Sequence, residues 1–217
     1  MIVQDQTQQE PRLGIDVIGF GVGEFAYLLN VFEGPARDRS VAVFRAEEMV
    51  DDVSLSTAGA SSLLARELAT VDHDGNLGVR GVAAAVATAL GQATRWTEIS
   101  LLTAETMDNV AFVEAPDVAI MLQPRLLGTW FVFAKDPSLS SAEATLRIVQ
   151  QHVAENPAGS AYFVFKTLDS ERHLLVRRED GTWITGVPDF DTDDVAETAG
   201  LDDAALLAAI EDARGAA

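Results

Sequence analysis

Three glycines near the start of the chain are its nearest approach to a cofactor-binding motif. Gly19, Gly21 and Gly23 follow the apolar run 15–18, as the glycines of a dinucleotide-binding loop follow a strand. That loop has the spacing GxGxxG, in which the third glycine lets the helix pack closely. Here position 24, where the pattern requires glycine, is Glu24, and its charge would repel a pyrophosphate. We interpret residues 19–23 as a flexible lead into the first strand, with nucleotide binding as the alternative.

The aspartates before the last predicted helix are spaced like the opening of a calcium loop. They are Asp189, Asp191, Asp193 and Asp194. An EF-hand requires glycine at the sixth position of its loop and glutamate at the twelfth, and those positions hold Asp194 and Gly200. Because both requirements fail, we interpret this stretch as a solvated acidic linker.

Nucleophilic and thiolate chemistry have little support. The chain has no cysteine, which excludes disulfides, thiolate catalysis and cysteine-ligated metals. Its three histidines, His73, His152 and His173, are far apart in sequence, and no GxSxG elbow is present. Residues that meet only in space remain an open route to catalysis. We predict a protein that is not an enzyme and uses neither a cofactor nor a metal ion.

Charge and hydropathy limit the partners of this chain. Its 217 residues have a formal net charge of -19, and 48% of them are hydrophobic, which is ample for a core. Such a charge repels phosphate backbones and anionic lipid, so we expect neither nucleic acid nor a membrane as partner. The charge serves either solubility or the steering of basic partners. The polar residues 1–12 lack the features of a secretory signal, so we expect a cytoplasmic protein with a flexible tail at 1–12.

The stretch 69–134 predicts a helix that leads into an antiparallel meander. An alanine-rich helix over 79–95 follows a turn at 72–76, where Asp-Gly-Asn favours positive φ. Four short apolar runs come next, and we expect each to be a strand. They are residues 97–102, 110–113, 118–122 and 129–133.

The rest of the chain repeats this order. A helix over 138–155 has Ser140 or Ser141 as N-cap and ends at Asn156-Pro157. Strands are expected at 161–166, 173–177 and 182–187, and a closing helix at 201–214. Before the first meander, 61–71 is helical, while 41–50 fits a helix or a strand equally. We predict one α+β domain over 13–217, with a central, mostly antiparallel sheet in two similar halves and flanking helices. Core packing is expected for Trp96, Trp130 and Trp183, because tryptophan buries a large apolar area.

The segment LATVDHDGNLGVRGVAAAVATALGQATRWTEISLL resembles the EspG family of actinobacterial type VII secretion chaperones. The shared features are the glycine turn at 72–76, the helix with valines four residues apart, the exit Ala93-Thr94-Arg95-Trp96 and the strand after it. DGTWITG at 180–186, an acidic stretch and a closing helix are similar to the family's end. The resemblance implies a cytosolic chaperone or adaptor that binds a secreted helical client, PE–PPE-like or WXG-like.

The family resemblance also implies where such a client binds. In the family, the loop between the second and third strands helps to grip the client, and here we match it to the short connection 103–109. Its shortness favours a helical client different from the family's own. Met107 is an adaptable apolar side chain that a simple connector has no need to expose. An ordinary hairpin turn is the alternative interpretation. The predicted partner-binding residues are Thr103, Glu105, Thr106, Met107 and Asp108.

Overall fold

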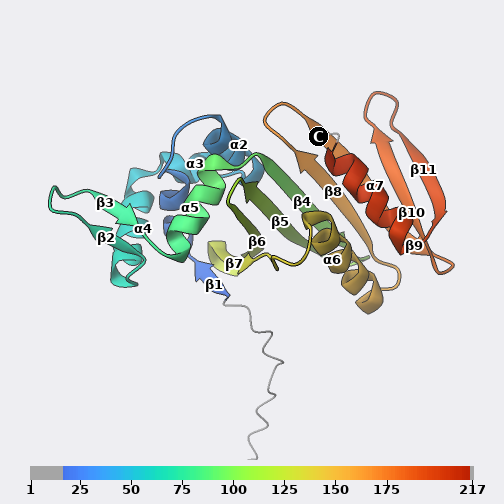
Figure 1. The fold of residues 1–217 in the computed structure, drawn as a ribbon, viewed down its shortest axis with the longest axis horizontal. Coiled ribbons are helices and arrows are strands. Elements are labelled where there is room, and N and C mark those ends of the chain that lie inside the picture. The colour runs from blue at the N-terminus through green and yellow to red at the C-terminus, as the bar shows by residue number, and fades with distance from the viewer. Residues whose placement is uncertain (1–16, 216–217) are drawn as a thin grey trace, which may run out of the picture.

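The computed structural model of the chain describes residues 17–215. The predicted flexible tail, 1–12, lies outside these residues. In the described part, helices and strands form an α+β fold built on one nine-stranded sheet and a separate two-stranded hairpin (Figure 1). The fold class predicted from the sequence is confirmed.

Every neighbouring pair of strands in the large sheet is antiparallel. The order across the sheet is β1-β7-β6-β5-β4-β8-β9-β10-β11. The strands are β1 (Ile18–Phe20), β4 (Arg95–Leu102), β5 (Met107–Ala115), β6 (Val118–Arg125), β7 (Thr129–Ala134), β8 (Ser160–Lys166), β9 (Glu171–Glu179), β10 (Thr182–Asp189) and β11 (Asp194–Leu201). The hairpin consists of β2 (Ala69–Val71) and β3 (Leu77–Val79).

The large sheet contains two meanders joined at the centre. β4 to β7 follow one another outward in one direction, β8 to β11 do so in the other, and β4 pairs with β8. Each meander is preceded by a helix, α5 (Val82–Gln92) or α6 (Ser141–Glu155). Turn chemistry explains the short connections, for example Asp180 and Gly181, both at positive φ, between β9 and β10. The two similar halves predicted from the sequence are therefore present.

The remaining helices are unevenly distributed between the halves. Before the first meander come α1 (Val22–Leu29), α2 (Pro35–Phe44), α3 (Glu47–Asp51) and α4 (Val53–Ala65), and after the second comes α7 (Asp203–Gly215). Figure 1 shows α1 to α5 gathered around one end of the sheet, while α6 and α7 lie across the strands of the second half. The short η1 helix (Leu126–Gly128) connects β6 to β7.

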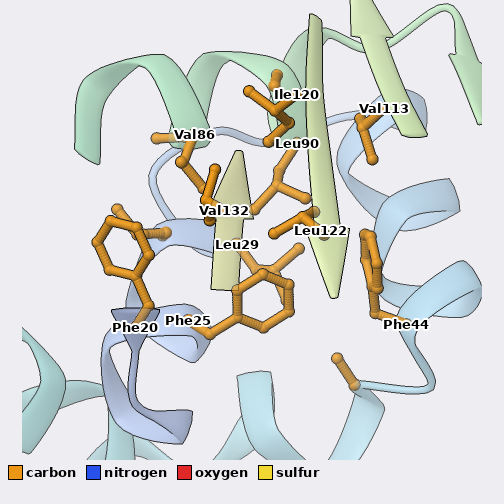
Figure 2. Packing of buried hydrophobic residues seen from close by; sticks show 14 of the residues in the cluster. Phe20, Phe25, Leu29, Phe44, Val86, Leu90, Val113, Ile120, Leu122 and Val132 are labelled. Atoms are coloured by element: carbon orange, nitrogen blue, oxygen red, sulfur yellow. The ribbon is translucent and has the colours of Figure 1, made fainter. Parts of the chain in front are cut away.

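Two hydrophobic cores lie on opposite faces of the sheet. Successive side chains of a strand point to opposite faces, and β5 contributes Ala111 and Val113 to one core but Val110 and Phe112 to the other. The first core packs against α1, α2 and α5, and Figure 2 shows Phe25 and Leu29 of α1 meeting side chains of β6 and β7. The second packs against α6 and α7. The helices of the two halves therefore cover different faces.

The predicted helix and strand boundaries are largely correct in the two meanders. Ser140 is the N-cap of α6, and with Glu143 it forms a capping box in which each side chain bonds the other's main-chain N–H. Trp96 and Trp183 are fully buried. Trp130 is half-buried and stacks on Phe25 with ring centroids 4.5 Å apart. All three tryptophans pack in the cores, as expected.

Three expectations about local structure were wrong. The acidic stretch was expected to be a linker, but Asp194 begins β11, which forms through main-chain pairing with β10 although its side chains are exposed. The helix expected from position 79 begins at Val82, because Val79 ends a strand paired with β2. The helix expected over 61–71 ends at Ala65, and residues 69–71 form β2 instead. The segment 41–50, for which helix and strand were both open, is helical and contains the end of α2 and most of α3.

Candidate functional site

The glycine-rich segment forms a helix start that is already occupied by a carboxylate. β1 is an edge strand antiparallel to β7, not a central parallel strand. It leads through Gly21 into α1, and the buried Glu24 accepts a hydrogen bond from the Gly21 N–H at 3.0 Å. Ser62 donates to the same carboxylate at 2.7 Å and Arg66 at 2.6 Å. A phosphate at this helix start would meet a negative charge whose oxygens already have partners.

Close packing of two helices explains the third glycine of this segment. Gly23 of α1 lies against Gly59 of α4, and a Cβ on Gly59 would come within 1.9 Å of the Gly23 carbonyl oxygen. A Cβ on Gly23 would come within 2.8 Å of the Leu55 oxygen. These contacts require glycine at both positions, so the motif serves helix packing.

The predicted turn after β4 is tightly ordered by its first residue. The Thr103 hydroxyl accepts hydrogen bonds from the N–H groups of Glu105 and Thr106, and Thr103 N–H donates to the Thr106 carbonyl at 2.9 Å. Met107 already belongs to β5, and 61% of its surface is exposed. Its exposure agrees with the expectation from the sequence.

The five predicted residues divide between the two faces of the sheet. Met107 points to the face that carries the first core, because it has the same strand parity as Ala111. Asp108 points to the other face, where its carboxylate accepts a hydrogen bond from Gln123 at 2.9 Å and lies 3.9 Å from Arg125. Thr103, Glu105 and Thr106 lie in the turn itself.

The turn between β6 and β7 adds two residues that the sequence analysis missed. Leu126 is 89% exposed and Leu127 is 97% exposed. Leu127 has a φ of 62°, a left-handed conformation that costs about 1–2 kcal/mol for an ordinary residue. The sequence does indicate a turn here, because Pro124-Arg125 and Gly128 bracket the two leucines in a connection between predicted strands.

The exposed methionine and the two leucines share one end of the sheet. The β5–β6 register pairs Ala111 with Leu122, and its continuation brings Met107 level with Leu126. The contact between Asp108 and Arg125 agrees with that register. We call Met107, Leu126 and Leu127 the apolar rim.

Two hollows adjoin the apolar rim. Met107 borders a cavity of about 340 Å³ that is also lined by Phe44 and Arg45 at the end of α2 and by Pro124 and Trp130 of the sheet. Leu127 borders a more open hollow of about 440 Å³ between the start of α1 and α4. The rim thus combines projecting apolar side chains with recesses, which is typical of a protein-binding surface.

The three histidines occupy separate places. His73 is exposed in the β2–β3 turn, and His152 is mostly buried, with Nε2 3.0 Å from the Leu102 carbonyl oxygen. His173 lies on β9, with Nδ1 2.6 Å from the Tyr162 hydroxyl and Nε2 3.1 Å from Glu171. Burial and the nearby carboxylates Glu171 and Glu98 raise the pKa of Tyr162. The structure does not bring the histidines together.

The aspartate-rich segments do not form a calcium loop. Asp189 accepts a hydrogen bond from the Asp191 N–H, and main-chain bonds of this kind lower its pKa. In the β2–β3 turn, Asp72, His73 and Asp74 lie close enough together to hold a cation, but all three are exposed. The Asp72 carboxylate already accepts main-chain hydrogen bonds from Asp74 and Asn76. Turn geometry accounts for these residues.

Comparison with known proteins identifies the fold. No family model and no curated protein matches the chain. Its structure matches that of the Mycobacterium tuberculosis type VII secretion system chaperone EspG5, solved in complex with a PE25–PPE41 dimer. The match covers 91% of this chain and 95% of that one, with a TM-score of 0.54 and 10% sequence identity. The chain therefore has the fold of an EspG-type chaperone, as the sequence resemblance implied.

The length and hydropathy of the helices bear on a membrane-spanning role. Over the described residues, none combines the length and apolar character needed to cross a bilayer.

Proposed function

We propose that this protein is a cytoplasmic chaperone or adaptor that binds a secreted helical client of a type VII secretion system, PE–PPE-like or WXG-like. The observation that carries the proposal is the shared fold with EspG5 over nearly the whole of both chains. That protein was solved with a PE25–PPE41 dimer bound. A non-enzymatic role also fits the geometry, in which the glycine-rich segment serves helix packing and the histidines lie apart.

The client surface in this proposal is the apolar rim together with the turn 103–106. The exposed leucines and methionine lie beside recesses. They would become buried in a complex, and a few such buried side chains supply most of the binding energy of an interface. Methionine has a flexible, polarisable side chain that adapts to an irregular apolar surface such as the tip of a helical hairpin. Arg125 and Asp108 beside the rim supply polar contacts at its border.

The direct test is co-purification with defined clients. The protein is co-expressed with the PE–PPE-type and WXG-type pairs of its source genome, and complexes are measured by size-exclusion chromatography with light scattering. We expect a stable complex with at least one pair. If all pairs elute separately from the chaperone, the proposal is wrong. A purely structural subunit is distinguished by a complex that persists through export instead of dissociating before it.

The nucleotide-binding alternative has its own test. Because the Glu24 carboxylate occupies the start of α1, millimolar NAD, NADP or ATP should leave the melting temperature unchanged. Ligand linkage would raise it if the native state bound one of them. A rise of several degrees would restore the nucleotide-binding enzyme as the leading hypothesis.

Met107→Asp tests the predicted loop within the client surface. Placing a charge on an apolar anchor should weaken client binding by about 2 kcal/mol, measured by isothermal titration calorimetry. The fold should be retained, because the side chain is largely exposed. Val71→Asp is the matched control. Val71 is also exposed, but it lies in the separate β2–β3 hairpin, so this variant should bind the client normally. Equal affinities of Met107→Asp and wild type at unchanged stability would remove this loop from the site.

A further inference from the structure

The outer edge of β11 is the longest unpaired strand edge in the described part of the chain. At the other side of the sheet, the edge strand β1 has only Ile18–Phe20. β11 runs from Asp194 to Leu201, and its regular pairing with β10 covers 194–198, before a register irregularity. The main-chain N–H and C=O groups of such an edge form a template for another strand.

The side chains of β11 are also exposed on both faces. Every residue from Asp194 to Gly200 is exposed, so neither α7 nor another helix covers the strand. Large apolar side chains remain accessible beside it: Val187 is 53% exposed, Phe190 64% and Val195 37%. Phe190 lies in the β10–β11 turn and rests edge-on against His173 of β9, with ring centroids 4.7 Å apart, so its ring leans inward from the outer edge. The edge thus combines free main-chain groups with apolar contacts.

The charge of this region specifies the kind of partner. From 179 to 203 there is no lysine or arginine. The acidic residues of that stretch are Glu179, Asp180, Asp189, Asp191, Asp193, Asp194, Glu197, Asp202 and Asp203. Arg177 on β9 is already shared between Glu179 and Glu197. A second copy of the chain would bring like charges together, whereas a basic segment would be attracted.

We propose that the edge of β11 at 194–198 binds an extended, lysine- or arginine-rich segment of a partner protein as a tenth strand of the sheet. Strand addition supplies affinity through the main chain, and the flanking pockets and charges supply selectivity. In this arrangement, the partner's basic side chains meet the aspartates of the β10–β11 turn, and its apolar side chains meet Val195. The proposal does not depend on the client surface, because the apolar rim belongs to the first meander.

The first experiment uses three acetylated and amidated octapeptides on the full chain. One alternates lysine and valine, the second alternates glutamate and valine, and the third is the lysine peptide with alternate main-chain amides N-methylated. The lysine peptide should slow hydrogen exchange of the amides within 194–198, measured by NMR. N-methylation keeps the charge but blocks the ladder, so it should weaken binding about tenfold or more. The glutamate peptide should not bind.

The second experiment changes the charge of the turn. Asp191→Asn with Asp193→Asn should weaken binding of the lysine peptide roughly tenfold, in line with the loss of two nearby charges. Asparagine tolerates the positive φ of Asp193, so the fold should persist. Glu47→Gln with Glu48→Gln in α3 removes the same charge elsewhere and should leave binding unchanged.

Three results would overturn the proposal. They are unchanged exchange within 194–198 with the lysine peptide present, equal binding of the lysine peptide and its N-methylated form, and equal loss of binding in the two double variants. Slowing of exchange that grows with protein concentration alone, without peptide, would identify a second copy of the chain as the occupant and would also overturn it.

Discussion

The two meanders have the same order of elements, but their corresponding turns differ in chemistry. The turn between the third and fourth strands is apolar in the first meander, where it carries Leu126 and Leu127. In the second meander it is acidic, with Asp189, Asp191 and Asp193 around Phe190. A repeated framework therefore presents two unlike surfaces, one suited to apolar anchors and the other to basic partners. Similarity of backbone does not imply similarity of binding.

The halves also differ in how their helices are held. In the first, α1 and α4 approach through glycines without side chains between them, and Ser40 of α2 bonds the buried Trp96 Nε1 at 2.9 Å. In the second, α6 begins with a capping box and α7 places Asp203 within 2.6 Å of Trp183 Nε1. The first half depends more on close backbone packing, and the second on caps and charge.

The largest expected effect tests the glycine contact of the first half. Gly59→Ala would place a Cβ 1.9 Å from a main-chain oxygen of α1, so the helices must separate. The free energy of unfolding, measured with urea, should fall by about 3 kcal/mol. Gly78→Ala in β3 is the control, because nothing lies within 4 Å of a Cβ there. A Gly59→Ala protein as stable as wild type would show that the helices do not cross so closely.

The second prediction separates stability from client binding at the apolar turn. Asparagine accepts the left-handed conformation of Leu127 more readily than leucine does. Leu127→Asn should therefore raise the free energy of unfolding by about 1 kcal/mol, while removing an anchor should weaken client binding by about 2 kcal/mol. Chemical denaturation and calorimetry give the two values. Leu168→Asn, an exposed leucine of the β8–β9 turn, should leave client binding unchanged, and loss of binding in both variants would contradict the assignment.

The smallest expected effect concerns the acid dependence of the second half. Hydrogen bonds from the main chain and side chain of Ser140 lower the pKa of Glu143. A carboxyl group with a lowered folded-state pKa stabilises the native state above its unfolded pKa, and this contribution is lost as pH falls through the folded value. Glu143→Gln should therefore be less stable than wild type at pH 7, and the two should converge in acid. Glu211→Gln on α7 serves as the surface control in the same denaturant series. If the stability difference between Glu143→Gln and wild type persisted unchanged in acid, the stabilising role of the Ser140–Glu143 capping box would be contradicted.

Local chemistry made the meanders and α6 predictable. Turn residues such as Asp180-Gly181 separate apolar runs, and Ser140 with Glu143 marks the start of a helix from sequence alone. β11 was missed because its exposed residues show no apolar alternation, and only pairing with β10 makes it a strand. The same limit applies to 41–50, whose helical form depends on packing against the first core.

The candidate site was predictable only in part. Met107 could be expected to be exposed because it lies in a short polar connection. Pro124-Arg125 and Gly128 mark Leu126 and Leu127 as part of a connection, but their near-complete exposure follows from a tight turn with a positive φ at Leu127. Their proximity to Met107 depends on the β5–β6 register. Sequence supplied one member of the rim, whereas strand pairing was needed for the other two.

The pairing of β4 with β8 has a consequence for the newly made chain. All seven residues of β8 pair with β4, from Ser160 to Lys166, and they are synthesised more than fifty residues after β4 ends. Until they leave the ribosome, the first meander presents β4 as an open edge with Ile99 and its neighbours uncovered by the second half. Premature termination between the halves would thus release a species prone to association. At the β4–β8 pairing, the synthesis of β8 therefore competes with association of other chains through the open edge of β4.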